Sequence, residues 1–173
     1  MAEFKSGFVA MLGRTNVGKS TLLNMLVGEK VAATANKVQT TRTAIKGIVN
    51  RENSQIIFID TPGIHKPKTK LNETMVETSF GVINEIDLIL FVIEATSEDI
   101  GRGDMRILEK IKESHKKAIL IVNKIDLVKR EKLLHLIDIY QKEYNFEVVI
   151  PISSLKEKYR DIILDEIEKN LKP

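Results

Sequence analysis

The chain has 173 residues, a formal net charge of +3 and a pI of about 9.0, a positive excess too small to indicate nucleic-acid binding by itself. It contains no cysteine, which excludes disulfide bonds, thiolate metal sites and a cysteine nucleophile. Its apolar runs are too short to cross a membrane, and only 5% of its residues are aromatic, with no tryptophan, so no stacking platform for single-stranded bases is visible.

Strand and helix signals alternate from one end of the chain to the other. Short apolar runs predict strands at residues 7–12, 43–50, 55–60, 88–93, 118–123 and 147–152. Helical periodicity and end signals predict helices at residues 19–27, 70–86, 103–114, 130–143 and 155–171. This alternation predicts a single α/β domain, with a six-stranded, mostly parallel sheet covered by helices on both faces. A short polar turn at residues 51–54 joins two strands as a hairpin, so we expect one antiparallel edge strand.

The segment from Gly13 to Ser20 (GRTNVGKS) fits the phosphate-binding loop pattern, in which four residues separate two glycines and Lys-Ser follows. It stands between a predicted strand and a predicted helix, the context that this pattern requires. Glycine lets backbone N–H groups turn around phosphate oxygens, and the helix directs its dipole at the same anion. We expect Lys19 to reach the outer phosphates and the Ser20 hydroxyl to join the coordination shell of Mg²⁺. The alternative is a chance match on an ordinary strand-to-helix turn.

Asn123-Lys124-Ile125-Asp126 follows a buried strand, at the edge of an open α/β sheet where ligands bind. The Asp126 carboxylate can accept hydrogen bonds from N1–H and from the 2-amino group of guanine, and adenine offers neither donor. A site built in this way can discriminate by roughly 10⁴-fold or more. We expect Asn123 and the aliphatic part of Lys124 to brace the loop and pack on the base. Without the phosphate loop, the same residues would be an ordinary polar turn.

Two further segments are expected near the terminal phosphate, in long polar loops of the kind that tend to be functional. Asp60 ends a predicted strand, and we expect it to hold Mg²⁺ through a water, while Gly63 offers its backbone N–H to the phosphate. Loss of that phosphate would release the loop, which is an order-to-disorder switch. In the earlier loop, the Thr41 hydroxyl is expected to complete the Mg²⁺ shell. The alternative for the segment after Asp60 is a plain β-turn. The alternative for Thr41 is the ordinary preference of threonine for strands.

The C-terminal part carries one weaker signal and two apolar stripes. Ser153 and Ser154 follow the last predicted strand, where their backbone can approach the guanine carbonyl oxygen, although a helix N-cap explains serine there equally well. Apolar side chains recur at helical spacing on the last two predicted helices, and we expect both stripes to face the core. Their members are Leu133, Ile137, Tyr140 and Tyr144, then Leu155, Tyr159, Ile163, Ile167 and Leu171.

Taken in order, these motifs resemble the translation-factor-like branch of the P-loop GTPases. In detail, the phosphate loop, KVQTTR at residues 37–42, DTPGIH at residues 60–65, NKID at residues 123–126 and PIS at residues 151–153 resemble the GTPase domain of the Era family. Era proteins are bacterial GTPases that assist assembly of the small ribosomal subunit. The chain departs from relatives at Thr15, where they usually have proline, and after Ser153, where they have small residues and glycine.

The resemblance implies a three-layer, Ras-like G domain at residues 1–173 that binds and hydrolyses GTP and serves 30S subunit assembly and 16S rRNA maturation. It implies Mg²⁺ as cofactor, with K⁺ as a second ion held by Asn16 against the phosphates. The implied partners are GTP and GDP and, through a KH domain that lies outside this chain, the small ribosomal subunit and its 16S rRNA. It further implies a monomer without an integral membrane segment, located in the cytoplasm or peripherally at the inner membrane.

The expected site residues divide by role. The residues expected to contact GTP are Gly13, Arg14, Thr15, Asn16, Val17, Gly18, Lys19, Ser20, Thr21, Asp60, Thr61, Pro62, Gly63, Ile64, Asn123, Lys124, Asp126, Ser153 and Ser154. Those expected to act in hydrolysis are Lys19, Thr41, Gly63 and Asn16, and the expected Mg²⁺ ligands are Ser20, Thr41 and Asp60.

One position bears directly on the rate of hydrolysis. Ras-like enzymes carry a glutamine after the Asp-x-x-Gly motif that orients the attacking water, and this chain has Ile64 there. Slow intrinsic hydrolysis is therefore expected, with water positioned by backbone, metal or a partner. Two alternatives to a ribosome-assembly hydrolase remain open. One is a nucleotide-dependent scaffold that docks on RNA or a partner and hydrolyses GTP incidentally, and the other is an Era-like GTPase of tRNA modification or large-subunit assembly.

Overall fold

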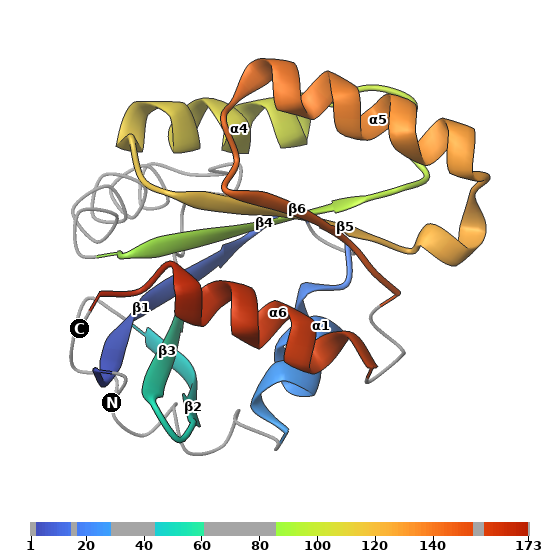
Figure 1. The fold of residues 1–173 in the computed structure, drawn as a ribbon. Coiled ribbons are helices and arrows are strands. Elements are labelled where there is room, and N and C mark those ends of the chain that lie inside the picture. Colours follow the sequence, from blue (N-terminus) through green and yellow to red (C-terminus); the bar gives the residue numbers. More distant parts are fainter. Residues whose placement is uncertain (1–2, 15–16, 29–43, 61–85, 154–157, 173) are drawn as a thin grey trace.

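The computed structural model describes residues 3–14, 17–28, 44–60, 86–153 and 158–172. The described strands form one six-stranded sheet in the order β2-β3-β1-β4-β5-β6 (Figure 1). They are β1 (Lys5–Leu12), β2 (Ala44–Asn50), β3 (Ser54–Asp60), β4 (Leu88–Glu94), β5 (Ala118–Asn123) and β6 (Val148–Pro151). The described helices are α1 (Lys19–Val27), α4 (Arg102–Ser114), α5 (Arg130–Glu143) and α6 (Lys158–Lys169), with a short 3-10 helix η2 (Ile125–Leu127) after β5.

Neighbouring strands are parallel except β2 and β3, which confirms the predicted α/β sheet with one antiparallel edge strand. α1, α5 and β5 begin and end at the predicted residues, whereas β6 is shorter than predicted at both ends. α6 ends at Lys169, before the predicted residue 171, because the chain then extends and Lys172 pairs with Ser6 of β1. The helix predicted at residues 70–86 lies outside the described residues except Ile86, which is not helical.

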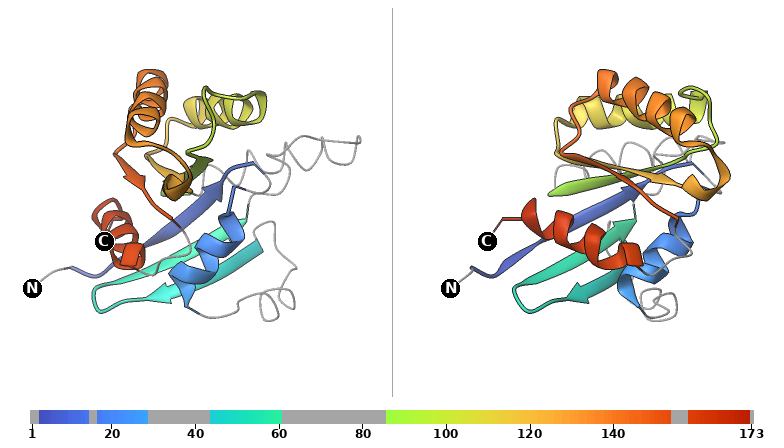
Figure 2. Two further views of the ribbon diagram at one scale, coloured as in Figure 1. Left: turned by 90° about the vertical axis from the view of Figure 1, so that its right-hand side faces the viewer. Right: turned by 45° about the vertical axis from the view of Figure 1, so that its right-hand side comes forward.

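Helices cover both faces of the sheet, which confirms the three predicted layers (Figures 1 and 2). α4 and α5 pack on one face, where Ile107, Leu108 and Leu136 join a core cluster with alternate residues of the central strands. α1 and α6 pack on the other face, around Leu22 and Ile163. All six residues of β5 are buried, as expected for a strand between two helical layers.

The two apolar stripes face the core as predicted. On α6, Ile163 and Ile167 are fully buried and Leu171 follows the helix into the same cluster, while Leu155 lies outside the described residues. On α5, Tyr140 is fully buried, and its ring meets the ring of Phe91 edge-on at a centroid distance of 5.9 Å. The described members of these stripes therefore pack on the domain's own core and stabilise it.

Candidate functional site

The sequence motifs meet at one edge of the sheet. β1, β3, β4, β5 and β6 run parallel, so their carboxyl ends lie together, and ligands of open α/β sheets bind at this edge. The phosphate loop follows β1, Asp60 ends β3, the Asn123–Asp126 motif follows β5, and Ser153 follows β6. The remaining predicted site residues lie outside the described residues: Thr15, Asn16, Thr41, Thr61, Pro62, Gly63, Ile64 and Ser154.

The described part of the phosphate loop is shaped by its glycines. A Cβ at Gly13 would lie 2.6 Å from the backbone oxygen of Val92 in β4, so only glycine fits there. Gly18 has a φ of 99°, a left-handed conformation that favours glycine, and it turns the chain directly into α1. No described side chain caps α1, so the N–H groups of its first turn are available to an anion. Lys19 and Ser20 are the first two residues of this helix.

Asn123 joins the phosphate loop to the second motif. Its Nδ2 donates a hydrogen bond of 2.9 Å to the backbone oxygen of Val17, a residue 106 positions earlier in the chain. Its Oδ1 accepts a hydrogen bond of 2.8 Å from the backbone N–H of Lys124. Both Asn123 and Val17 are buried. This geometry agrees with the bracing that we expected of Asn123, and it fixes the distance between the two loops.

Replacing Asn123 with alanine should lower the free energy of unfolding by about 1–3 kcal/mol, because the buried oxygen of Val17 would lose its donor. Urea denaturation without added nucleotide measures this change. Asn24→Ala, at an exposed position of α1, is the control and should stay within about 0.5 kcal/mol of the unaltered chain. An Asn123→Ala chain as stable as this control would show that the hydrogen bond does not hold the loops together.

The residues after Asn123 turn toward solvent. Lys124 has a φ of 65°, and Asp126 is exposed in the short helix η2. The Ile125 N–H donates to the backbone oxygen of Ile152 at 3.2 Å, which holds this turn against the end of β6, next to the buried Ser153. The carboxylate of Asp126 is therefore accessible to a ligand, while the backbone around it is fixed from two sides.

Sequence reasoning missed Glu94, the last residue of β4. Its Oε1 lies 2.8 Å from Nζ of Lys124, and its Oε2 accepts a hydrogen bond from Thr96 Oγ1 at 3.2 Å. The hydrogen bond that Lys124 donates holds the pKa of Glu94 below its usual value. The ammonium group of Lys124 is thus directed to β4, and the packing of its aliphatic part on a base stays a prediction. A carboxylate at the carboxyl end of a buried strand was the sequence signal for this residue.

Arg14, a predicted GTP contact, makes an ion pair that the sequence did not predict. Its side chain turns to α4, where Nε lies 3.0 Å from Oδ1 of Asp104. The phosphate-loop pattern meets phosphate with backbone N–H groups, and this ion pair leaves the backbone of Arg14 in that loop.

The oxygen donors expected for Mg²⁺ suit that ion. Ser20 is the second residue of α1 and Asp60 is the last residue of β3. Hydroxyl and carboxylate oxygens are the ligands that Mg²⁺ takes alongside phosphate and water. Within the described residues, no group of three or more histidine, aspartate or glutamate side chains could hold a metal by itself. A site completed by a nucleotide phosphate fits this pattern better than an all-protein metal cage.

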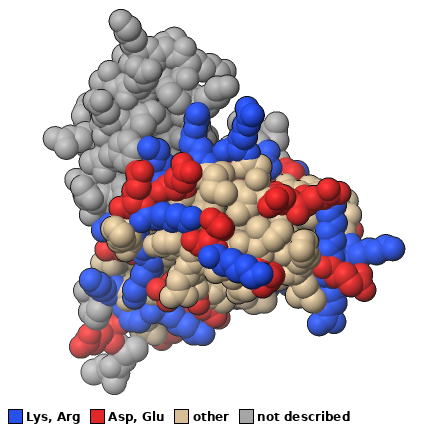
Figure 3. Space-filling view, turned by 90° about the horizontal axis from the view of Figure 1, so that it is seen from above, with Lys and Arg blue, Asp and Glu red and all other residues tan. Residues whose placement is uncertain are grey.

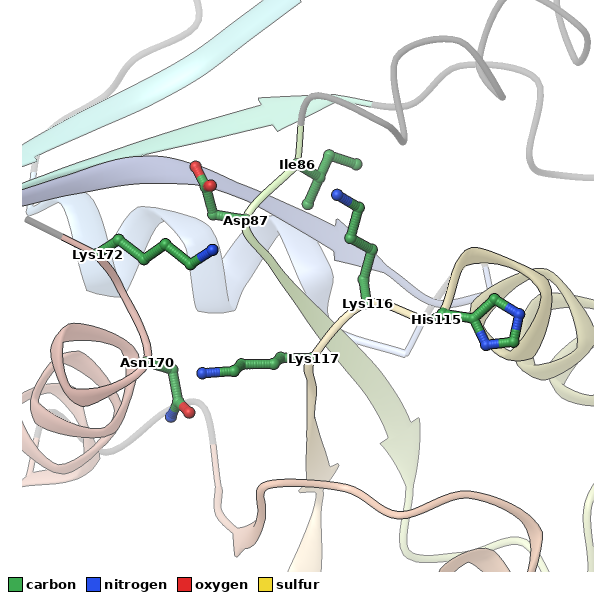
Figure 4. Close-up of a pocket in the computed structure, with 7 residues that line it drawn as sticks. All are labelled: Ile86, Asp87, His115, Lys116, Lys117, Asn170 and Lys172. Carbon is green, nitrogen blue, oxygen red and sulfur yellow. The ribbon is translucent and has the colours of Figure 1, made fainter.

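A separate hollow lies at the opposite edge of the sheet, at the start of β4 and β5 (Figure 4). It is lined by Ile86, Asp87, His115, Lys116, Lys117, Asn170 and Lys172. Asp87 is committed to the fold, since its Oδ2 accepts a hydrogen bond from the Phe8 N–H at 2.8 Å. None of the predicted site residues that the structure describes lines this hollow. Within the described part of the chain, no helix is long and apolar enough to cross a membrane.

The phosphate loop and the parallel sheet that carries it define a P-loop fold, and the chain belongs to the 50S ribosome-binding GTPase family, whose model matches residues 8–124. Within this class its likeness is to Era. It is 50% identical over 164 residues to GTPase Era of Ruminiclostridium cellulolyticum, covering 95% of this chain and 55% of that protein. The predicted resemblance to the Era GTPase domain is thereby confirmed.

Two crystal structures of Era extend the likeness to the fold. Era in complex with MgGDPNP and nucleotides 1506–1542 of 16S ribosomal RNA matches with a TM-score of 0.80 and 41% identity, over 99% of this chain and 58% of that one. An Aquifex aeolicus Era variant bound to GDP and AlF₄⁻ matches with a TM-score of 0.76 and 40% identity, over 98% and 58%. The Ras-like G-domain fold is confirmed, and the chain spans little more than half the length of these relatives.

Proposed function

We propose that this chain is a GTP-binding domain that hydrolyses GTP to GDP and phosphate. The hydrogen bond from Asn123 to the Val17 backbone supports this most directly, because it joins a phosphate-binding loop to a motif suited to guanine. Family membership and the Era relatives support the same reading. The proposed GTP contacts are those predicted from the sequence, and the backbone of Arg14 makes its contact because its side chain pairs with Asp104.

In this proposal the residues divide the work by position. Backbone N–H groups of the phosphate loop and the Lys19 ammonium hold the phosphates and oppose the charge that develops on them. Ser20, Thr41 and Asp60 hold Mg²⁺, which when bound neutralises charge on the phosphate oxygens. The Gly63 N–H donates a hydrogen bond to the terminal phosphate, so loss of that phosphate on hydrolysis would release the loop that contains Gly63. Ile64 has no polar atom to orient water, and slow turnover by the isolated chain follows.

We further propose that this activity serves assembly of the small ribosomal subunit through 16S rRNA. The support is that relatives about 50% identical are Era proteins, one of which was crystallised with a 16S rRNA fragment. The face over α4 and α5 mixes Lys and Arg with Asp and Glu in its described part, which does not suit an extended RNA backbone (Figure 3). We assign RNA recognition to the KH domain because the resemblance implies one. A cytoplasmic location, with at most peripheral contact with the inner membrane, accompanies this role.

GTP turnover by the purified chain and by its full-length protein, each with and without 30S subunits, tests the proposal. The expected result is slow turnover by the chain, with acceleration of the full-length protein by subunits. Turnover indistinguishable from background under every condition would instead favour a nucleotide-loaded scaffold, the second function that Ile64 supports. Acceleration by 50S subunits or by tRNA in place of 30S subunits would favour another Era-like GTPase.

Potassium should accelerate hydrolysis relative to sodium, because a K⁺ ion held by Asn16 would supply positive charge at the phosphates. The measurement compares turnover in matched KCl and NaCl for the unaltered chain and for Asn16→Ala. Equal rates in both salts, unchanged by the substitution, would remove K⁺ from the mechanism.

A further inference from the structure

Arg14 makes a contact that phosphate binding does not require. Its Nε lies 3.0 Å from Oδ1 of Asp104, in the first turn of α4. The preceding residue of α4 is shaped to the same side chain, since a Cβ at Gly103 would lie 2.6 Å from Cδ of Arg14. Two successive residues in the first turn of α4 therefore accommodate the Arg14 side chain: Gly103 leaves space for it, and Asp104 pairs with it.

The burial of the Asp104 carboxylate lowers the stability of the folded chain. Its side chain is 1% exposed, whereas that of Arg14 is 36% exposed. Both carboxylate oxygens of Asp104 are buried without a well-aligned donor among the described residues, while the Arg14 guanidinium and the buried Tyr140 hydroxyl lie against the carboxylate. Burial raises the pKa of Asp104, although Arg14 and Tyr140 oppose this shift and act to lower the pKa. A carboxyl group whose pKa is raised by folding destabilises the folded state once it is ionised, so Asp104 lowers stability at neutral pH.

The fold gains little from this carboxylate, but the phosphate loop gains an anchor. Arg14 follows Gly13 directly, and the ion pair ties the loop to a helix that packs on the opposite side of the sheet from α1. Asn123 holds the other end of the loop through Val17. The loop is thus fixed on both sides of the two residues that lie outside the described part of the chain.

We propose that Asp104 is a positioning residue for the nucleotide site, which acts through Arg14 to hold the phosphate loop in its binding conformation. The proposal rests on the function proposed above, and it deepens the account of that site. Strained or costly groups that stabilise function rather than fold are expected at sites that must be organised before the ligand arrives. Loss of the carboxylate should therefore loosen the loop while leaving the fold as stable as before or more stable.

Asp104→Asn tests this by two measurements. Without nucleotide, hydrogen exchange of the amides from Gly13 to Ser20 should become faster, while the thermal unfolding midpoint stays unchanged or rises. With nucleotide, the dissociation constants for GTP and GDP should rise by about 5- to 30-fold. Arg14→Ala should give the same losses, and the double variant should lose no more than either single one. Glu109→Gln, at an exposed position of the same helix, is the matched control.

Gly103→Ala provides a second variant in case the first does not fold. Alanine is the better helix former, so it should not destabilise α4, yet its methyl group would displace the Arg14 side chain. Loop exchange and nucleotide affinity that stay at control values in both variants would overturn the proposal, as would a lower unfolding midpoint with unchanged loop exchange. Faster loop exchange in a chain that never binds GTP would contradict the proposed function but leave the anchoring role standing.

Discussion

Asp126→Asn should lower the affinity for GTP by about 10²- to 10⁴-fold and shift the preference toward xanthosine triphosphate. The carboxylate is predicted to accept two hydrogen bonds from guanine, and a bond to a charged group contributes about 1.5–3 kcal/mol. Their loss corresponds to two to four decades of dissociation constant at about 1.4 kcal/mol per decade. Xanthine carries a carbonyl where guanine has the 2-amino group, so an asparagine N–H₂ can donate to it. Calorimetric titration with both nucleotides measures the change.

The fold should not respond to this substitution, because Asp126 is exposed in η2. Asp138→Asn is the matched control, since Asp138 is an exposed carboxylate on α5 that pairs with Lys142. The control should bind GTP as the unaltered chain does. If Asp126→Asn bound GTP with unchanged affinity and ignored the xanthosine nucleotide, the carboxylate would not be the group that recognises the base.

Lys19→Ala should reduce GTP turnover by at least about 10²- to 10³-fold and weaken nucleotide binding as well. Lys19 is the first residue of α1, and its ammonium group is proposed to stabilise the charge that develops on the phosphates. Removal of one such group has effects of this size. Alanine keeps the helix propensity of the position, so unfolding without nucleotide should change little. Single-turnover assays at saturating GTP separate the effect on chemistry from the effect on binding.

Lys142→Ala, in the last turn of α5, is the control and should hydrolyse GTP at the normal rate. A Lys19→Ala chain with normal turnover would mean that the loop does not hold phosphate in the predicted way. Normal turnover of both variants together with tight GTP binding would move the chemistry to a different part of the molecule.

Local sequence patterns were sufficient to predict the described helices and strands and the edge of the sheet at which the motifs meet. The apolar run at residues 118–122, ended by Asn123, predicted β5 to the residue, because a strand buried on both faces is nearly continuously apolar. Gly28 ended α1 as glycine commonly does, with a φ of 82°. Parallel strands then bring the carboxyl ends of β1 and β5 to one edge without further information.

The contacts that tie the site together were not predictable in the same way. Glu94 with Lys124, and Arg14 with Asp104, pair residues that are far apart in the chain, and no local pattern specifies their partners. Asp104 occupies a core-facing position of α4 where helical periodicity calls for an apolar residue. Such an exception to the pattern is a signal in itself, since sites for function are where a local rule is most often broken.

The central claim is that the phosphate loop and the Asn123–Asp126 motif form one site selective for guanine nucleotides. Isothermal titration of the unaltered chain with GTP and with ATP, each with Mg²⁺, tests it most directly. The account predicts that GTP binds at least about 10³-fold more tightly than ATP, because adenine has no hydrogen-bond donors for the Asp126 carboxylate. Equal dissociation constants for the two nucleotides would contradict it.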